Sequence, residues 1–407
     1  MIRIIDKYNC CGCSACVLVC PKNCIIFDED ERGFRYPLVN KELCIDCGLC
    51  EKVCPCLNQG EPQKPIQVFS VVNPNENIRK KSSSGGAFTM IAEVVIDEGG
   101  LVFGARFDEN WEVVHDYTET KAGLEAFCGS KYVQSRIGDT YTQARGFLKQ
   151  GRKVLFTGTS CQIAGLKLFL RKEYDNLLTI DVVCHGVPSP LVWRDYLTAL
   201  SVYTLDIVDK KTNVPTRIDR NRISGISFRD KISGWKKFSF VMRSSQIHVS
   251  SPACTKDDII FQETLDKNLY LQIFLRNLDL RPSCYNCPAK SGKCKSDFTL
   301  GDFWGYSNEK AQKDDDRGIS LVLVNTEAAK ELIRRFEPLV ESSYDEAFKG
   351  NITLEHSVQE PKYAAAFWEQ YKVSGVKGAV DIVNKLKPSA FRVFISRLKN
   401  KFFVIQK

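Results

Sequence analysis

The chain has 407 residues, of which 43% are hydrophobic and 26% are charged, and 18 of them are cysteines. Such a length exceeds what one hydrophobic core usually holds, so we expect two or three domains of ordinary globular composition. No apolar run reaches the roughly 18 residues that cross a membrane, and the N-terminus lacks the apolar segment of a signal peptide. We therefore expect a cytoplasmic protein, in which abundant cysteine indicates metal ligation rather than disulfide bonds.

The net charge of +8 comes from one end of the chain. Residues 372–407 contain nine Lys or Arg and one acid, whereas acids and bases balance over the preceding residues. A neutral body gives no support for nucleic-acid binding. The basic end also places Phe391, Phe394, Leu398 and Phe402 at helical spacing, which predicts an amphipathic helix. This helix is interpreted either as a peripheral contact with an acidic partner or membrane surface, or as a terminal helix packed on its own domain.

Two near-copies of one cysteine pattern lie within residues 1–60. Each has the spacing C-x2-C-x2-C-x3-C-P, which is typical of ferredoxins with two [4Fe–4S] clusters, where the last cysteine of each run binds the other cluster. Zinc sites with four cysteines use two pairs and do not need this triplet. We assign cluster one to Cys10, Cys13, Cys16 and Cys54, and cluster two to Cys44, Cys47, Cys50 and Cys20. Three further cysteines, Cys11, Cys24 and Cys56, are interpreted as small buried thiols.

Residues 25–39, between the two runs, predict a hairpin with an acidic turn near Gly33. Residues 57–65 contain two Pro and one Gly without apolar periodicity, and they predict a linker. Strands and helices then alternate, which indicates an α/β layer with helices on a sheet. The predicted strands are Gln67–Val72, Leu101–Phe107, Glu112–Tyr117, Val154–Phe156 and Leu178–Val183, with helices after Gly86, from Gln162 and after Pro190.

The third region begins at about Gly225 with two strand-like patches, and a helix is predicted from about Asp257 to Leu278. A cysteine-rich loop, a strand at Ser320–Val324 and a helix starting near Thr326 follow. The expected fold is mixed α/β and α+β behind a ferredoxin-like domain. The predicted domains are 1–60 (ferredoxin), 67–205 (α/β), 206–345 (with the cysteine-rich loop) and 346–407 (helical basic tail).

Three small-residue turns are candidates for binding a dinucleotide such as FAD. Two of them begin a predicted helix, where free N–H groups and the helix dipole favour a phosphate, and the third adds a lysine. Taken alone, each is better explained as an ordinary helix cap or turn, and it is the presence of three in one α/β domain that favours a dinucleotide. The candidate cofactor-binding residues are Ser83, Ser84, Gly85, Gly86, Ser130, Lys131, Gly158, Thr159 and Gln162. A flavin suits an iron–sulfur protein because it exchanges single electrons with a cluster and hydride with a substrate.

A second metal site is predicted at Cys284, Cys287 and Cys294, which lie in a Pro/Gly/Lys-rich loop and need one more ligand. Zinc is an alternative to a third [4Fe–4S] cluster here. Among the candidates for the fourth ligand, Cys184 is favoured because it lies beside a Gly/Pro turn. The others are Cys161, Cys254 and Cys128.

The candidate catalytic residues are Cys161, His185 and Lys131. Cys161 is predicted at a helix N-terminus, which lowers the pKa of a thiol. His185 lies in a turn, where it would donate a proton near neutral pH or simply bind backbone.

Six motifs, in order, resemble the coenzyme F420 hydrogenase/dehydrogenase beta-subunit family: SSSGGAFT, GSKYVQS, GTSCQIAGL, VVCHGVPSPLVW, SFRDK with a following GW, and CYNCPAK with SDFTLGDFWG. The resemblance covers roughly residues 1–310. It implies a module with flavin and iron–sulfur clusters that passes electrons between a donor and a deazaflavin or another acceptor. It also implies that the motif turns hold FAD and that the C-terminal cysteines hold a further [4Fe–4S] cluster. The length and layout resemble the stand-alone, ferredoxin-fused members, whose substrates differ.

Two functions are therefore open. The first is a flavoprotein oxidoreductase that exchanges electrons with an unidentified acceptor and receives them from a soluble carrier. The second is a non-catalytic subunit that delivers electrons to a partner redox enzyme.

Overall fold

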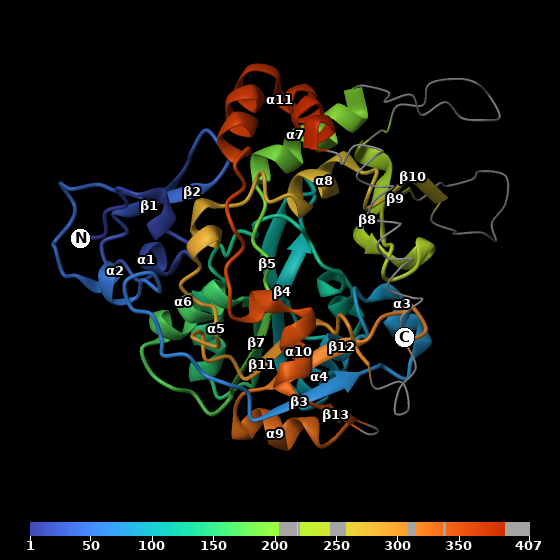
Figure 1. The fold of residues 1–407 in the computed structure, drawn as a ribbon. Coiled ribbons are helices and arrows are strands. Elements are labelled where there is room, and N and C mark those ends of the chain that lie inside the picture. The colour runs from blue at the N-terminus through green and yellow to red at the C-terminus, as the bar shows by residue number, and fades with distance from the viewer. Residues whose placement is uncertain (203–217, 219, 245–257, 308–313, 337–338, 387–407) are drawn as a thin grey trace.

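The computed structural model describes residues 1–202, 218, 220–244, 258–307, 314–336 and 339–386. Figure 1 shows a small N-terminal unit on one side of a large central sheet and a small second sheet on the other side. Helix α11 (Ala364–Leu386) lies at the top of this view, in contact with α7 (Pro190–Val202). The architecture is mixed α/β behind a ferredoxin-type unit, as predicted. The predicted amphipathic segment from Phe391 lies outside the described residues.

The N-terminal unit has two short helices and one hairpin. The helices are α1 (Ala15–Leu18) and α2 (Leu49–Lys52), one in each cysteine run, and the strands are β1 (Ile25–Glu29) and β2 (Arg35–Val39). The strands pair antiparallel with Ile25 opposite Val39, so the predicted hairpin is confirmed. The hairpin faces the second cysteine run with Ile25 and Val39, and this brings the two runs together.

The central sheet has eight strands in the order β13-β3-β12-β11-β7-β6-β4-β5. Its inner strands β4, β6, β7 and β11 are parallel, and antiparallel strands flank them. The strands are β3 (Gln67–Val71), β4 (Leu101–Phe107), β5 (Val113–Thr118), β6 (Val154–Thr159), β7 (Leu177–Val182), β11 (Phe298–Asp302), β12 (Ser320–Val324) and β13 (Val340–Ser342). The sheet thus combines strands from before and after residue 205, where a domain boundary is predicted. The boundary stays a prediction.

Helices cover both faces of this sheet because alternate strand residues point to opposite sides. Leu101 and Phe103 of β4 pack into one apolar cluster with α5 and α6, whereas Val102 packs into another with α4 and α9. The helices are α3 (Glu76–Lys81), α4 (Ala87–Asp97), α5 (Thr140–Lys149), α6 (Ser160–Leu170), α9 (Glu327–Ile333) and α10 (Tyr344–Gly350). Cys13 and Ala15 of the N-terminal unit belong to the α5/α6 cluster, so this unit docks on that face.

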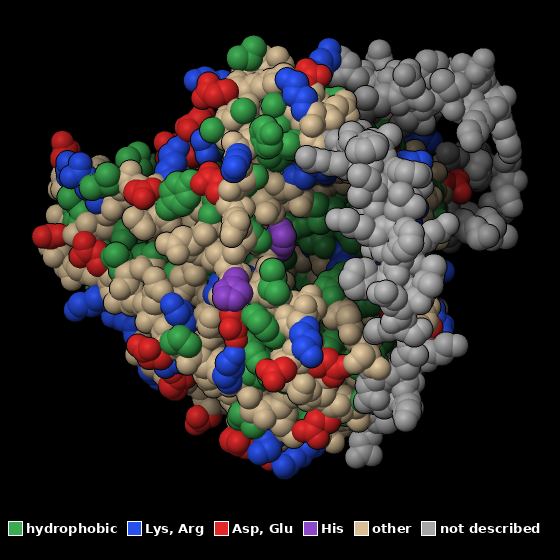
Figure 2. All heavy atoms as spheres, viewed as in Figure 1, with side chains coloured by type: hydrophobic (Ala, Val, Ile, Leu, Met, Phe, Trp, Pro, Cys, Tyr) green, Lys and Arg blue, Asp and Glu red, His purple; other side chains and the backbone are tan. Residues whose placement is uncertain are grey.

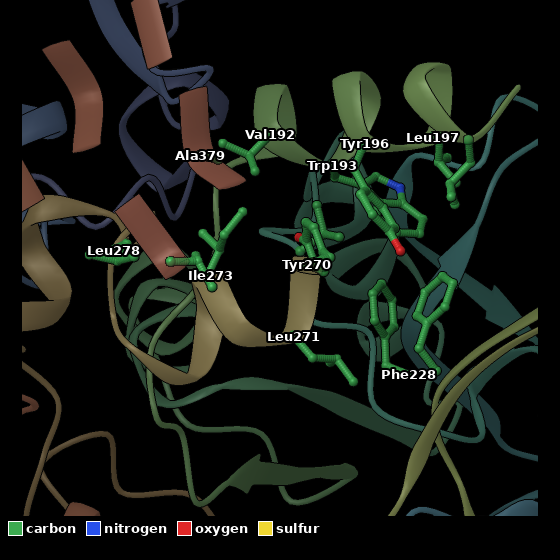
Figure 3. Close-up of a cluster of buried hydrophobic side chains, with 14 of the residues drawn as sticks. Val192, Trp193, Tyr196, Leu197, Phe228, Tyr270, Leu271, Ile273, Leu278 and Ala379 are labelled. Atoms are coloured by element: carbon green, nitrogen blue, oxygen red, sulfur yellow. The ribbon is translucent and has the colours of Figure 1, made fainter. Parts of the chain in front are cut away.

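The small sheet consists of β8 (Ile223–Asp230), β9 (Ser239–Ser244) and β10 (Asp258–Thr264). It packs against α7, α8 (Leu269–Leu275) and α11 through an aromatic core, part of which is drawn in Figure 3. Trp193 is central to this core because its ring lies 4.9 Å from that of Phe228 and 5.1 Å from that of Tyr270.

The predicted helix from Asp257 to Leu278 is wrong over its first half. Residues 258–264 form β10, in which Phe261 pairs with Met242 of β9. A helix begins only at Leu269, where the Asn268 side chain accepts a hydrogen bond from the Leu271 N–H and caps it. The apolar residues of this strand and of the short helix after it happen to fall at a spacing that resembles one long amphipathic helix.

The described residues contain no helix that is long and apolar enough to cross a membrane. Figure 2 shows acidic and basic side chains interspersed over the visible face. This distribution agrees with the balanced charge of the body.

Candidate functional site

The two cysteine runs have the same backbone conformation. Gly12 and Asp46, which occupy equivalent positions, both have positive φ, at 70° and 49°. Two residues later Ser14 and Gly48 do so again, at 67° and 70°, and each begins a four-residue helix. Left-handed residues alternating with ordinary ones curl the chain and turn its N–H groups inward. Each run therefore forms a tight loop whose N–H groups suit an anionic iron–sulfur cluster.

The second run lines an open cavity, whose volume of about 350 Å³ includes solvent at its mouth. It gathers the residues predicted for cluster two together with one more cysteine: its lining includes Cys20, Cys24, Cys44, Cys47 and Cys50. The Cys20 and Cys24 sulfurs are 3.4 Å apart, so the structure offers two neighbouring thiols where the sequence predicts one ligand. Cys47 is exposed, which places this cavity at the surface.

The first run is more deeply placed. Cys10, Cys13 and Cys16 are all buried, and Cys54 is half-buried beside Cys56. Burial raises the pKa of the Cys10 and Cys16 thiols, because a bare thiolate is costly away from water. Iron supplies the positive charge that lets such thiols bind as thiolates. The residues of both runs therefore fit [4Fe–4S] clusters, and the individual ligand sets stay a prediction.

A second cysteine-lined cavity lies where the first run meets the central sheet, and its volume of about 400 Å³ also includes solvent at its mouth. The turn after β6 contributes Cys161, the loop after β7 contributes Cys184, and the short helix η5 (Pro282–Asn286) with the residue after it contributes Cys284 and Cys287. Carboxyl ends of neighbouring parallel strands are where α/β sheets commonly bind ligands. Cys11 of the first run also lines this cavity.

The lining of this cavity overlaps in part with the predicted third ligand set. Cys184, Cys284 and Cys287 come together as predicted, but Cys161 lines the cavity with them and Cys294 does not. The Cys294 side chain is buried instead beside Ser296 and Asp181. Among the described residues, no three or more His, Cys, Asp or Glu side chains are arranged to hold a single metal ion.

Cys11 connects the two cysteine regions. Its thiol is buried, and the neighbouring thiols of Cys13, Cys161 and Cys56 raise its pKa. Chiefly because of the Cys11 thiol, the pKa of Cys161 is lowered to about 7. The predicted lowering at Cys161 thus has a neighbouring thiol as its main cause, which sequence spacing could not reveal. Cys11 was interpreted as a small buried thiol, and it is buried, but it also bridges two candidate metal sites.

The other candidate catalytic residues are held by neighbouring polar groups. His185 lines the same cavity, with its Nε2 2.6 Å from Asn277 Oδ1, and burial lowers its pKa. A neutral His185 therefore donates from Nε2 to the amide oxygen. Lys131 donates to the carbonyls of Ala126 and Cys128 at 2.8 and 2.9 Å, and burial lowers its pKa to about 8. The structure does not place Lys131 in the cysteine-lined cavity.

Two of the three candidate flavin turns meet each other. The Ser130 N–H donates to Ser83 Oγ at 2.6 Å. A Cβ at Gly85 would lie 2.2 Å from the Val71 carbonyl oxygen, so this glycine is already required by packing. Gly86 caps α4 with a φ of 93°. Packing and backbone conformation therefore explain why glycine stands at these two positions, without a bound phosphate.

The third turn belongs with the cysteines. Thr159 and Ser160 line the cysteine cavity, and Thr159 and Gln162 form the capping box that starts α6. The Gln162 Nε2 also donates to Ser135 Oγ at 3.0 Å. Across this turn, His115 Nε2 lies 3.0 Å from the Thr157 carbonyl oxygen, and burial lowers the pKa of His115 to about 4. His115 is thus a neutral structural residue that the sequence did not single out.

Comparisons with known proteins agree with this layout. Residues 9–58 match the 4Fe-4S dicluster domain, and residues 151–341 match the C terminus of the coenzyme F420 hydrogenase/dehydrogenase beta subunit. A ferredoxin unit with paired cysteine runs ahead of a mixed sheet defines an iron–sulfur protein of the oxidoreductase and electron-transfer class. Residues 151–341 are similar to the C-terminal part of the coenzyme F420 hydrogenase/dehydrogenase beta-subunit family.

Individual relatives match parts of the chain. The coenzyme F420-dependent sulfite reductase of Methanocaldococcus jannaschii is 26% identical over 203 residues, which is 49% of this chain and 31% of that protein. The F subunit of the F(420)H(2) dehydrogenase of Methanosarcina mazei is 22% identical over 192 residues, which is 45% of this chain and 55% of that relative. A chain of the F420-reducing [NiFe] hydrogenase complex from Methanosarcina barkeri shares 15% identity with a TM-score of 0.44, over 79% of this chain and 92% of that one. The chain thus spans well under two thirds of these two sequence relatives.

Proposed function

We propose that the protein is an iron–sulfur flavoprotein oxidoreductase that receives electrons at its exposed ferredoxin cluster and delivers them through the cysteine-lined cavity to a bound flavin. The supporting observation is Cys11, which belongs to the first cysteine run and also lines the cavity of Cys161, Cys184, Cys284 and Cys287. The second run is at the surface and the first run is buried. This order gives electrons one route from the surface to the sheet.

The cysteine-lined cavity is proposed to hold a third [4Fe–4S] cluster. Cys161, Cys184, Cys284 and Cys287 supply four thiols, which is the number such a cluster needs. The donor set therefore fits, and Cys161 replaces Cys294 as the proposed ligand. When bound, the flavin would supply the change from single-electron to hydride chemistry. The chain's own contribution is to bring these thiols together and to orient His185 through Asn277.

Metal analysis of anaerobically purified protein tests the third cluster. We expect about 12 irons per chain, from three clusters of four, and no stoichiometric zinc. Cys184→Ser should reduce the iron content to about eight, whereas the matched control Cys294→Ser should keep about twelve. Eight irons with one zinc in the unmodified protein would refute the third cluster. Iron loss in Cys294→Ser alone would refute the revised ligand set.

The flavin is tested separately by extraction and by reconstitution with FAD. We expect FAD in the purified protein, or binding of about one FAD per chain on reconstitution. Because Gly85 is fixed by packing, its substitution is a poor probe, and flavin content is the direct measurement. Protein that holds three clusters but binds no flavin would leave the Ser/Gly turns as helix caps and would refute the flavoprotein assignment.

The alternative function is that of an electron-transfer subunit. The relative from Methanosarcina mazei is named as a subunit of an F420H2 dehydrogenase, and this chain covers 55% of it. An acceptor such as a deazaflavin would then be reduced by, or together with, a partner protein. Turnover of the isolated chain with an artificial electron donor distinguishes the two, because only the oxidoreductase reduces its acceptor without a partner.

A further inference from the structure

Arg281 extends from the body of the protein into the ferredoxin unit. It directly precedes η5, and only 1% of the residue is exposed. Its Nε donates to the Cys10 carbonyl at 2.7 Å, and its Nη2 donates to the Arg35 carbonyl at 3.0 Å and to Cys10 Sγ at 3.5 Å. The Nη1 donates to Gln134 Oε1 at 3.0 Å, and Gln134 in turn donates to the Cys11 carbonyl. The guanidinium therefore touches a predicted ligand of cluster one.

The Arg281 side chain is closely packed by the first cysteine run and by the β1–β2 hairpin. A Cβ on Gly12 would lie 2.8 Å from its Nη1, so the first cysteine run is moulded around the guanidinium. The Tyr36 ring lies on its other side, with its centroid 4.3 Å from the guanidinium carbon. The groups whose negative charge, when ionised, most raises the pKa of Arg281 are Cys10, Tyr36, Cys11 and Cys284. A buried guanidinium with these neighbours has the thiolates of cluster one as its natural counter-charge.

Within the part of the chain that the structure describes, the second run has no equivalent buried cation. Asp46 occupies the position equivalent to Gly12, with its side chain 82% exposed and paired with the N-terminal ammonium at 3.0 Å. At Cys50 the hydrogen bond to sulfur comes from the neutral Ile2 N–H, at 3.2 Å. The two runs share one backbone conformation but differ in charge and exposure.

We propose that Arg281 raises the reduction potential of cluster one above that of cluster two, so that electrons move inward from the exposed cluster. Reduction adds one negative charge to a cluster, and a buried cation that also donates to a ligand sulfur stabilises that charge. The donor comes from the body, so the potential of cluster one also depends on docking of the ferredoxin unit. The inference rests on the proposed cluster ligands, and it needs neither the flavin nor the third cluster.

Redox titration of the full-length, cluster-loaded protein, followed by electron paramagnetic resonance, tests this role. In Arg281→Gln we expect the equilibrium constant for reduction of one ferredoxin cluster to fall by about tenfold, which is about 59 mV for one electron. The other cluster should be unchanged. Cys47→Ser, which removes a ligand of cluster two, identifies the signals. Arg281→Lys keeps the charge without the fork of hydrogen bonds, and it should shift the same cluster in the same direction by less.

Arg276→Gln is the matched control, because it removes the same charge from a nearby arginine that contacts Gln272 of its own helix. It should leave both potentials unchanged. Unaltered potentials in an iron-replete Arg281→Gln protein would overturn the proposal, as would an equal shift in Arg276→Gln. If Arg281→Gln loses iron, the potentials of Arg281→Lys test the proposal instead. Potentials equal to those of the wild type for both clusters in Arg281→Lys would overturn it.

Discussion

At the scale of single residues, Asp279 carries a carboxyl group that lacks a hydrogen-bond partner among the described residues. Both of its oxygens are buried, and burial raises its pKa to about 8. An unfolded chain ionises this group near pH 4. Between these pH values the folded state holds a proton that the unfolded chain has released. The free energy of unfolding therefore falls as pH rises from about 4 and levels off above about 8.

Asp279→Asn should remove this loss. We expect the variant to gain stability over the wild type as pH rises from 6 to 8, by up to about 1.4 kcal/mol for each pH unit. Thermal unfolding of both proteins at several pH values measures the difference. A difference that does not change with pH would show that Asp279 is ionised in the folded protein.

The two-cluster unit was predictable because the cysteines of each run are close in sequence. The spacing of both cysteine runs and the hairpin between them indicated a two-cluster unit, because loops of two residues leave few arrangements. The ligand set of the third site stays a prediction: Cys161, from the start of α6, lines the cavity, whereas Cys294, which follows Cys287 closely in the chain, does not. The role of Arg281 could not be predicted from its sequence neighbours, because its contacts are with residues far away in sequence.

At the scale of elements, helix α6 is the surface on which the first cysteine run docks. Gly165 in this helix has no room for a side chain, because its Cβ would lie 2.9 Å from both Cβ and Sγ of Cys13. Gly146 in α5 has open space around the equivalent atom. We expect Gly165→Ala to loosen docking and lower the iron content, whereas Gly146→Ala should keep all iron and gain up to about 1 kcal/mol of stability.

Iron analysis and thermal unfolding of the two variants give the comparison. Full iron content and unchanged stability in Gly165→Ala would show that the first run does not depend on this contact. At this scale the strands of the central sheet were predictable from their apolar runs. The division of residues 258–275 into strand and helix was not, because pairing with β9 decided it.

At the scale of the whole molecule, the excess positive charge lies in residues 372–407. Deleting residues 387–407 should leave cluster and flavin spectra unchanged. It should weaken binding to an acidic partner or to anionic vesicles, most strongly at low salt, because salt screens exposed charges beyond about 8 Å at physiological ionic strength. Sedimentation with vesicles at two salt concentrations measures this. Binding that ignores both salt and the deletion would refute a docking role, and loss of clusters would place the tail in the core.

The sheet order also bears on how the chain is synthesised. Strand β3, the first of the body, lies between β12 and β13, which are among the last. It has no neighbour in the sheet until those strands leave the ribosome, and pairings so distant in sequence are slow to form. The ferredoxin unit, by contrast, is complete in sequence before β3 begins. Its cysteines are thus available for cluster assembly while the surface that later covers the first run does not yet exist.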